Sequence, residues 1–300
     1  MNKEDYRSGF IAIIGRPNAG KSTLLNEILG RKVAIMSDKP QTTRNRITGV
    51  LTQKDAQMIF IDTPGIHKPK HKLGKYMVDV AEGSLEGVDL VYYMVDANAS
   101  FGSGEQYVVN RLKNSKIPVF LILNKIDLLT PDKILQTISE WQSRADFAEV
   151  FPLSALKGDN VQELVAKTIE YLPEGPQFYP EDAVTDQPEQ VVIGELIREK
   201  VLHLTREEIP HSVAVVVEML ETRPKNTVYI GATIYVERDS QKGIVIGKKG
   251  ALLKEIGLQA RMDIEKLLGS KVFLDLWVKV KDDWRNRERI LRDLGYDNRL

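Results

Sequence analysis

Short apolar runs alternate with helix-like stretches through the first half of the chain. The runs span residues 10–14, 47–51, 58–61, 90–95, 119–123 and 150–153. Strands that alternate with helices predict an α/β fold, in which a mostly parallel sheet has helices on both faces. In such a sheet, ligands bind at the carboxyl ends of the strands.

The segment 173–190 differs in composition from the sequence on either side. It contains four prolines, one glycine and five acidic residues, and no lysine or arginine. Prolines and like charges favour a linker over a packed element. We therefore place a first domain at residues 1–175, a linker at 176–190 and a second domain at 191–300.

The pattern after the linker is of another kind. A helical stretch at 191–204 precedes two strand-like runs, at 212–220 and 227–236, which are rich in Val, Ile and Tyr. A helical run at 251–268 and a strand-like run at 272–280 follow, so we predict an α+β domain.

A charged tail ends the chain. Its residues 284–292 predict an amphipathic helix with a basic face. A solvated capping helix, an RNA contact and a membrane-surface contact all remain open for it.

Composition restricts the chemistry. The 42 Lys and Arg residues balance 42 Asp and Glu residues, so any nucleic-acid contact has to be local. The chain has no cysteine, which excludes thiol nucleophiles and thiolate metal sites. With no basic start followed by an apolar run, and no apolar run of about 18 residues, we expect a cytoplasmic protein.

The first apolar run leads into Gly15-Arg16-Pro17-Asn18-Ala19-Gly20-Lys21-Ser22, and a helical stretch follows. Two glycines let backbone N–H groups point at phosphate oxygens, Lys21 can reach the outer phosphates, and the Ser22 hydroxyl can hold Mg²⁺. A plain glycine turn is the alternative, but the strand–loop–helix context favours a phosphate-binding loop, the P-loop.

Three further candidate motifs come directly after apolar runs. Asp62-Thr63-Pro64-Gly65 can act on Mg²⁺ through Asp62 and on a γ-phosphate through the Gly65 N–H. In Asn124-Lys125-Ile126-Asp127, the Asp127 carboxylate can accept hydrogen bonds from N1–H and the exocyclic amine of guanine, which adenine does not offer. Ser154-Ala155-Leu156 can bring a backbone N–H to guanine O6. The order of these motifs predicts a GTP site.

This ordered set resembles the translation-factor-related GTPases, from residue 8 to about residue 172. The polar segment 40–46 is then a candidate switch. By this resemblance Thr43, with Thr42 as the alternative, completes the coordination of Mg²⁺ when the γ-phosphate is present. An ordinary surface loop is the competing interpretation.

Ile66 occupies the position where many GTPases place a glutamine that orients the attacking water. Isoleucine cannot orient water. With Ile66, Asn18 and the Thr42-Thr43-Arg44 switch, the chain resembles a subgroup of GTPases that use a potassium ion near the phosphates. We hypothesise that Asn18 helps to hold K⁺ here, against the alternative that Asn18 only stabilises the loop.

His67 and His71 are four residues apart, but Pro69 lies between them and no third ligand is apparent. We favour a mobile basic loop over a metal pair for this segment.

Gly247-Lys248-Lys249-Gly250 separates an apolar run from the helical stretch 251–268 and resembles the nucleic-acid clamp of KH domains. Glycines allow a close approach of the sugar-phosphate chain, and the lysines attract phosphates. Four lysines and no acidic residue lie between residues 241 and 254. The order helix, strand, strand, helix, Gly-x-x-Gly, helix, strand over residues 190–281 resembles a type II KH domain. A purely structural domain is the alternative.

The whole chain resembles the Era-like subfamily of the TrmE-Era-EngA-type GTPases. The resemblance implies an α/β P-loop GTPase domain followed by an α+β type II KH domain, with GTP or GDP and Mg²⁺ as ligands. It also implies that the protein binds small-subunit rRNA near its 3′ end and assists 30S subunit maturation as a monomer. It further implies that the protein sometimes associates peripherally with the cytoplasmic side of the inner membrane.

Two rival functions are a tRNA-modification-type GTPase and a passive RNA-binding scaffold with a structural nucleotide. The tRNA-modification type needs a further domain, and the scaffold interpretation predicts no GTP turnover.

The resemblance assigns residues to four sets. The nucleotide-binding set is Gly15, Arg16, Pro17, Asn18, Ala19, Gly20, Lys21, Ser22, Thr23, Asp62, Thr63, Pro64, Gly65, Ile66, Asn124, Lys125, Ile126, Asp127, Ser154, Ala155 and Leu156. The catalytic set is Lys21, Asn18, Thr43, Asp62 and Gly65. The metal set is Ser22, Thr43, Thr42 and Asp62. The RNA-binding set is Ile244, Ile246, Gly247, Lys248, Lys249, Gly250 and Lys254.

Overall fold

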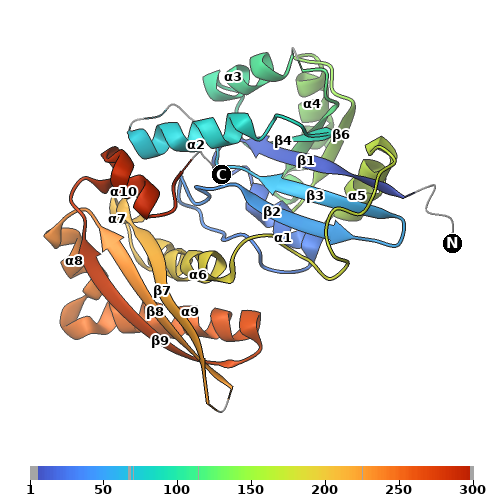
Figure 1. Ribbon diagram of the computed structural model, residues 1–300. Coiled ribbons are helices and arrows are strands. Elements are labelled where there is room, and N and C mark those ends of the chain that lie inside the picture. Colours follow the sequence, from blue (N-terminus) through green and yellow to red (C-terminus); the bar gives the residue numbers. More distant parts are fainter. Residues whose placement is uncertain (1–5, 67–68, 70, 114, 225, 298–300) are drawn as a thin grey trace. The chain divides into compact units, whose positions relative to one another are not determined.

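The six apolar runs of the first half all form strands of one sheet (Figure 1). The computed structural model describes residues 6–66, 69, 71–113, 115–224 and 226–297. The strands are β1 (Arg7–Gly15), β2 (Ile47–Thr52), β3 (Ala56–Asp62), β4 (Leu90–Asp96), β5 (Val119–Asn124) and β6 (Glu149–Leu153). Their order is β2-β3-β1-β4-β5-β6, and β2 alone of these six is antiparallel to its neighbour.

Helices cover both faces of this sheet, as predicted. They are α1 (Lys21–Leu29), α2 (Lys72–Gly83), α3 (Ser103–Leu112), α4 (Pro131–Gln142) and α5 (Val161–Tyr171), with a 3₁₀ turn, η2, at Ile126–Leu128. Successive strand residues point to opposite faces. Ile11 and Ile13 therefore join the core beneath α1 and α5, whereas Ala12 and Ile14 join the core beneath α2, α3 and α4. This arrangement leaves the carboxyl ends of the strands free to carry functional loops.

The second sheet has three strands, β7 (Ala214–Arg223), β8 (Thr227–Val236) and β9 (Lys271–Val280), in the order β7-β8-β9. The accompanying elements are α6 (Glu189–Leu204), α7 (Ile209–Ser212), α8 (Asp239–Ile246), η3 (Lys248–Gly250), α9 (Ala251–Leu268), η4 (Trp284–Asn286) and α10 (Glu288–Asp293). Side chains of α6 and α9 form one core with a single face of the sheet. The predicted α+β architecture is confirmed for this part of the chain.

The chain divides into two units whose boundary differs from the predicted linker. The first unit continues to Asp186, and the second begins at Gln187 and also includes residues 35–42 and 69–76. Residues 176–186 pack on the first sheet, where Gln57 accepts hydrogen bonds from the backbone of Phe178 and Tyr179 and Val50 N donates to Val184 O. Proline and acidic residues thus run along a strand edge here instead of forming a free linker.

The charged tail forms a short 3₁₀ helix and a short α-helix in place of the single helix predicted over residues 284–292. Asp283 adopts a left-handed φ of 49°, η4 ends at Asn286, and α10 starts at Glu288. Trp284 is fully buried, donates from Nε1 to Ser212 O at 2.9 Å and stacks on Tyr296. The helical backbone is broken at Arg287, which is extended with a φ of −106° and a ψ of 105°.

None of the helices that the structure describes combines the length and the apolar content needed to cross a membrane.

Replacing Trp284 by alanine should lower the free energy of unfolding by about 3–5 kcal/mol, because it leaves a cavity and removes a buried hydrogen bond. Urea unfolding of the full chain, followed by far-UV circular dichroism, measures this change. The matched control is Trp277→Ala, whose indole is 40% exposed, and it should cost far less. Equal losses for the two variants would contradict the packing role of Trp284.

Candidate functional site

The loop between β1 and α1 is shaped by glycines that no other residue could replace without movement. A Cβ added at Gly15 would lie 2.2 Å from the carbonyl oxygen of Met94, and one at Gly20 would lie 2.2 Å from Nδ2 of Asn124. Gly20 also has a φ of 102°, which side chains rarely allow. The backbone therefore stays close to the ends of β4 and β5, and its N–H groups line the entrance to α1.

Lys21, the first residue of α1, is buried and folds back over this loop. Its Nζ donates to the carbonyl oxygens of Gly15 at 3.2 Å and Arg16 at 3.0 Å. Burial lowers the pKa of Lys21 to about 8, and the neighbouring Asp62 opposes that shift. The ammonium group is held where the outer phosphates of a nucleotide would meet the loop.

Three oxygen-bearing side chains converge next to the loop. The Ser22 hydroxyl donates to Asp62 Oδ2 at 2.6 Å and lies 2.9 Å from Thr43 Oγ1. Asp62 is fully buried, which raises its pKa to about 6 against the opposing effect of Lys21, and its Oδ1 has no hydrogen-bond partner among the described residues. Hydroxyl and carboxylate oxygens with an unsatisfied buried acceptor fit a hard divalent cation such as Mg²⁺.

The structure brings Thr43, and not Thr42, to this cluster. The Thr42 hydroxyl instead donates to the carbonyl oxygen of Lys39 at 2.6 Å. Of the two threonines that the sequence left open, only Thr43 is placed to hold a metal with Ser22.

The region after Asp62 closes against the P-loop. Thr63 Oγ1 donates to Ile13 O at 2.8 Å, and Ile66 N donates to Gly15 O at 3.1 Å. A Cβ at Gly65 would lie 2.5 Å from Pro17 N. Ile66 is buried in the apolar cluster, so its side chain offers nothing to hold water.

Asn124 connects the phosphate side of the site to the base side. Its Nδ2 donates to Ala19 O at 2.7 Å, and its Oδ1 accepts from Ala155 N at 2.9 Å. Asp127 accepts a hydrogen bond from the Ser154 hydroxyl at 2.7 Å. The loops after β1, β5 and β6 thus meet, which is the placement needed to read a base beside the phosphates.

Lys125 adopts a left-handed φ of 69° and its Nζ pairs with Asp96 Oδ2 at 2.6 Å. This pairing lays the lysine stem along the same edge of the sheet.

Two arginines form long-range contacts that sequence reasoning missed, although Arg16 itself belongs to the predicted nucleotide-binding set. Arg16 bonds both carboxylate oxygens of Glu105 at 3.0 and 3.1 Å, which secures the P-loop to α3. In the second unit, the buried Arg198 of α6 donates to the carbonyl oxygen of Thr42, and Glu199 accepts from Met36 N at 2.9 Å. These partners are far apart in sequence, so no local pattern could have indicated them.

Of the two histidines considered as a metal pair, the structure describes only His71. His67 lies outside the described residues, and His71 Nδ1 accepts from the backbone N–H of Gly74 at 2.9 Å, at the start of α2. No group of three or more His, Asp or Glu side chains suited to a metal occurs among the described residues.

The Gly-x-x-Gly segment forms a tight turn between α8 and α9. Gly247, Lys249 and Gly250 have φ values of 73°, 54° and 81°, and both Lys248 and Lys249 are exposed. Here the backbone turns in a conformation that glycine favours, and the lysines point to solvent.

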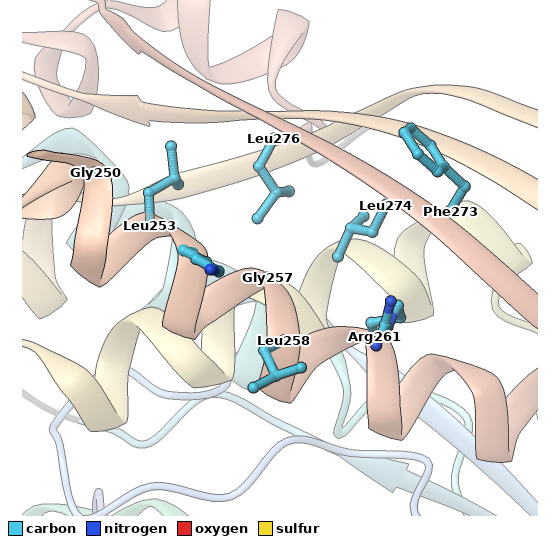
Figure 2. Close-up of a pocket in the computed structure, with 9 residues that line it drawn as sticks. Gly250, Leu253, Gly257, Leu258, Arg261, Phe273, Leu274 and Leu276 are labelled. Atoms are coloured by element: carbon cyan, nitrogen blue, oxygen red, sulfur yellow. The ribbon is translucent and has the colours of Figure 1, made fainter.

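Beside this turn, α9 and β9 enclose a groove of about 470 Å³ (Figure 2). Its lining residues are Gly250, Leu253, Lys254, Gly257, Leu258, Arg261, Phe273, Leu274 and Leu276. Gly250 and Lys254 belong to the predicted RNA-binding set, whereas Ile244 and Ile246 lie on α8 and do not line the groove. Arg261 and Phe273 were not predicted, although both lie within a helix and strand that were.

Two family models match the chain. Residues 10–125 match the model described as 50S ribosome-binding GTPase, and residues 208–285 match the KH domain model. The matches cover the P-loop, the Asp62 segment and the Gly-x-x-Gly turn.

Two solved structures resemble the chain over nearly its whole length. A crystal structure of Era in complex with MgGDPNP and nucleotides 1506–1542 of 16S ribosomal RNA is 44% identical, with a TM-score of 0.95, and the match covers 97% of this chain and 99% of that one. The chain belongs to the Era family. A point variant of Aquifex aeolicus Era bound to GDP·AlF₄⁻ is also 44% identical, with a TM-score of 0.94 and the same coverage of both chains.

Membership in the Era family confirms the predicted fold class, a P-loop GTPase domain followed by a KH domain. It also confirms the predicted reaction: the protein is a GTPase that converts GTP to GDP and phosphate. Neither the scaffold nor the tRNA-modification alternative agrees with this family.

In this Era-family chain, Asp127→Asn should weaken GTP binding about 100-fold, because an amide in place of the carboxylate loses the charge-assisted hydrogen bonds to guanine. Xanthosine triphosphate carries an oxygen where guanine has its amine, so the variant should prefer it. Calorimetric titration with both nucleotides measures the reversal. Asp132→Asn, an exposed position on α4, is the matched control and should bind GTP like the wild type. An unchanged preference for GTP in the Asp127 variant would refute the base-reading role.

Proposed function

We propose that the chain is a GTP-driven switch that binds ribosomal RNA near the 3′ end of 16S rRNA and assists maturation of the 30S subunit. The observation that carries the proposal is a 44%-identical Era structure with both MgGDPNP and 16S rRNA nucleotides, matched here over both units. The 50S description belongs to a family model that matches residues 10–125, whereas the Era structure matches 97% of the chain. We also propose cytoplasmic location and action as a monomer.

In the proposed nucleotide site, the loop N–H groups and the Lys21 ammonium bind the β- and γ-phosphates, and Asp127 selects guanine. Ser22, Thr43 and Asp62 would hold Mg²⁺, which supplies charge neutralisation at the phosphates when bound. Thr43 and the Gly65 N–H would engage only while the γ-phosphate is present. Their release after hydrolysis would loosen the segments that contain them.

We further propose that K⁺ replaces the missing water-orienting glutamine as a source of transition-state stabilisation. Ile66 is buried and cannot position water. Asn18 is exposed in the P-loop and has a left-handed φ of 64°. A carbonyl-type oxygen there suits a monovalent cation.

GTP hydrolysis should be at least about tenfold faster in potassium than in sodium buffer, since electrostatic stabilisation of the developing charge acts on kcat. Multiple-turnover phosphate release measures this ratio. Asn18→Gly removes the carboxamide and tolerates the positive φ, so it should abolish the ratio while GTP affinity stays near wild type. Equal rates of the wild type in the two salts would rule out the potassium mechanism.

The RNA part of the proposal depends on the Gly-x-x-Gly turn. Lys248→Asp/Lys249→Asp should weaken binding to nucleotides 1506–1542 of 16S rRNA by at least about 100-fold, because it reverses two charges beside the phosphate chain. Aspartate tolerates the left-handed conformation of Lys249, so the turn should persist. Fluorescence anisotropy measures the affinity.

The charge-matched control is Lys113→Asp/Lys116→Asp, which changes two exposed lysines of the first unit. It should retain RNA affinity, and both double variants should bind GTP normally. If the two double variants lose RNA affinity equally, net charge and not the turn carries the binding.

A further inference from the structure

The face of the second sheet that points away from α6 and α9 carries exposed aromatic side chains. Alternate residues of β8, such as Ile230 and Ile234, point into the core. On the opposite face, Met219, Phe273 and Trp277 are 49%, 57% and 40% exposed. We call Met219, Arg223, Tyr229, Phe273 and Trp277 the open-face patch. Large exposed apolar side chains gathered on one face indicate a binding surface.

Three members of the open-face patch form a ladder across all three strands. Phe273 of β9 is in register with Tyr229 of β8, and their rings are stacked with centroids 5.8 Å apart at 17°. The guanidinium carbon of Arg223, on β7, lies 3.9 Å from the centroid of the Tyr229 ring. Parallel aromatic rings with a guanidinium plane are the surface on which unpaired bases stack.

The ladder is continuous with the groove next to the Gly-x-x-Gly turn. Phe273 is both a ladder residue and a residue that lines the groove. It lies on β9, one of the two edge strands of the sheet. Figure 2 shows its ring on the other side of the β9 ribbon from the side chain of Leu274, which points toward α9. A nucleotide chain that leaves the groove across β9 therefore meets the Phe273 ring first and Tyr229 next.

Charges around the ladder suit a phosphate chain. Arg223, Lys271 and Arg261 are exposed near it, on β7, β9 and α9, whereas Glu221 and Asp275 lie on the same face. The Tyr229 hydroxyl lies 3.5 Å from Asp275 Oδ2, which gives that carboxylate a partner. Arg261 lies at the groove end of the ladder, and Arg223 lies at its other end, on β7.

We propose that the Phe273–Tyr229–Arg223 ladder is a second contact site for single-stranded RNA, which stacks bases that flank those held in the groove. This inference rests on the proposed RNA-binding function and extends it from the helix side of the sheet to its open face. The occupant is RNA and not a protein, because the ladder begins at Phe273, which lines the proposed RNA groove, and ends at the positively charged Arg223.

The test uses the full chain loaded with GDPNP and RNA of nucleotides 1506–1542 of 16S rRNA. Arg223→Ser/Tyr229→Leu removes the ladder beyond Phe273 and leaves the groove lining intact. It should bind this RNA about tenfold more weakly, because a stacking partner and a cation are lost. Its nuclease footprint should shorten at one end while the nucleotides protected by the groove stay protected.

The matched control is Tyr107→Leu/Arg111→Ser, an exposed tyrosine and arginine on α3 that should leave affinity and footprint unchanged. Unaltered affinity and footprint in the ladder variant, with binding still lost in Lys248→Asp/Lys249→Asp, would overturn the ladder alone. No binding by the wild type would overturn the proposed function together with the ladder. If the ladder variant keeps its RNA affinity but loses a wild-type dimer in sedimentation, the patch is an interface between two copies, and the proposal is wrong.

Discussion

The carboxamide of Asn124 holds the nucleotide site together because it forms hydrogen bonds with two loops at once. It donates to Ala19 O and accepts from Ala155 N, and the side chain is 3% exposed, so water cannot take over either bond. A buried donor or acceptor without a partner costs about 1–3 kcal/mol. Gly20 is tied to the same constraint, since any side chain there would collide with Asn124. The phosphate loop and the base loops therefore form one preorganised site.

Burial in this site acts against the charges that it needs. Desolvation lowers the pKa of Lys21 and raises the pKa of Asp62, so each group is pushed toward its neutral form. Their mutual attraction recovers only part of this cost. Perturbed groups of this kind are typical of functional sites, where phosphates and a cation complete the charge balance.

Much of the fold and site could be predicted from local patterns. The helix at residues 251–268 and the strand at 227–236 begin and end where the periodicity placed them, because apolar spacing and flanking glycines act locally. Pairings between distant residues, such as Arg16 with Glu105 or Gln57 with Phe178, leave no local signal. The helix prediction for the tail missed the break at Arg287, because contacts such as that of Trp284 with the distant Ser212 leave no local signal.

The position of Phe273 on an edge strand has an evolutionary consequence. Its ring lines the groove and also stacks on Tyr229 in the aromatic ladder, so a change that reshapes one surface also reshapes the second. A residue that contributes to both surfaces tolerates fewer replacements than Leu258 or Trp277, which each belong to one surface only. Across related sequences, this position should therefore drift slowly, and it should change in concert with Tyr229.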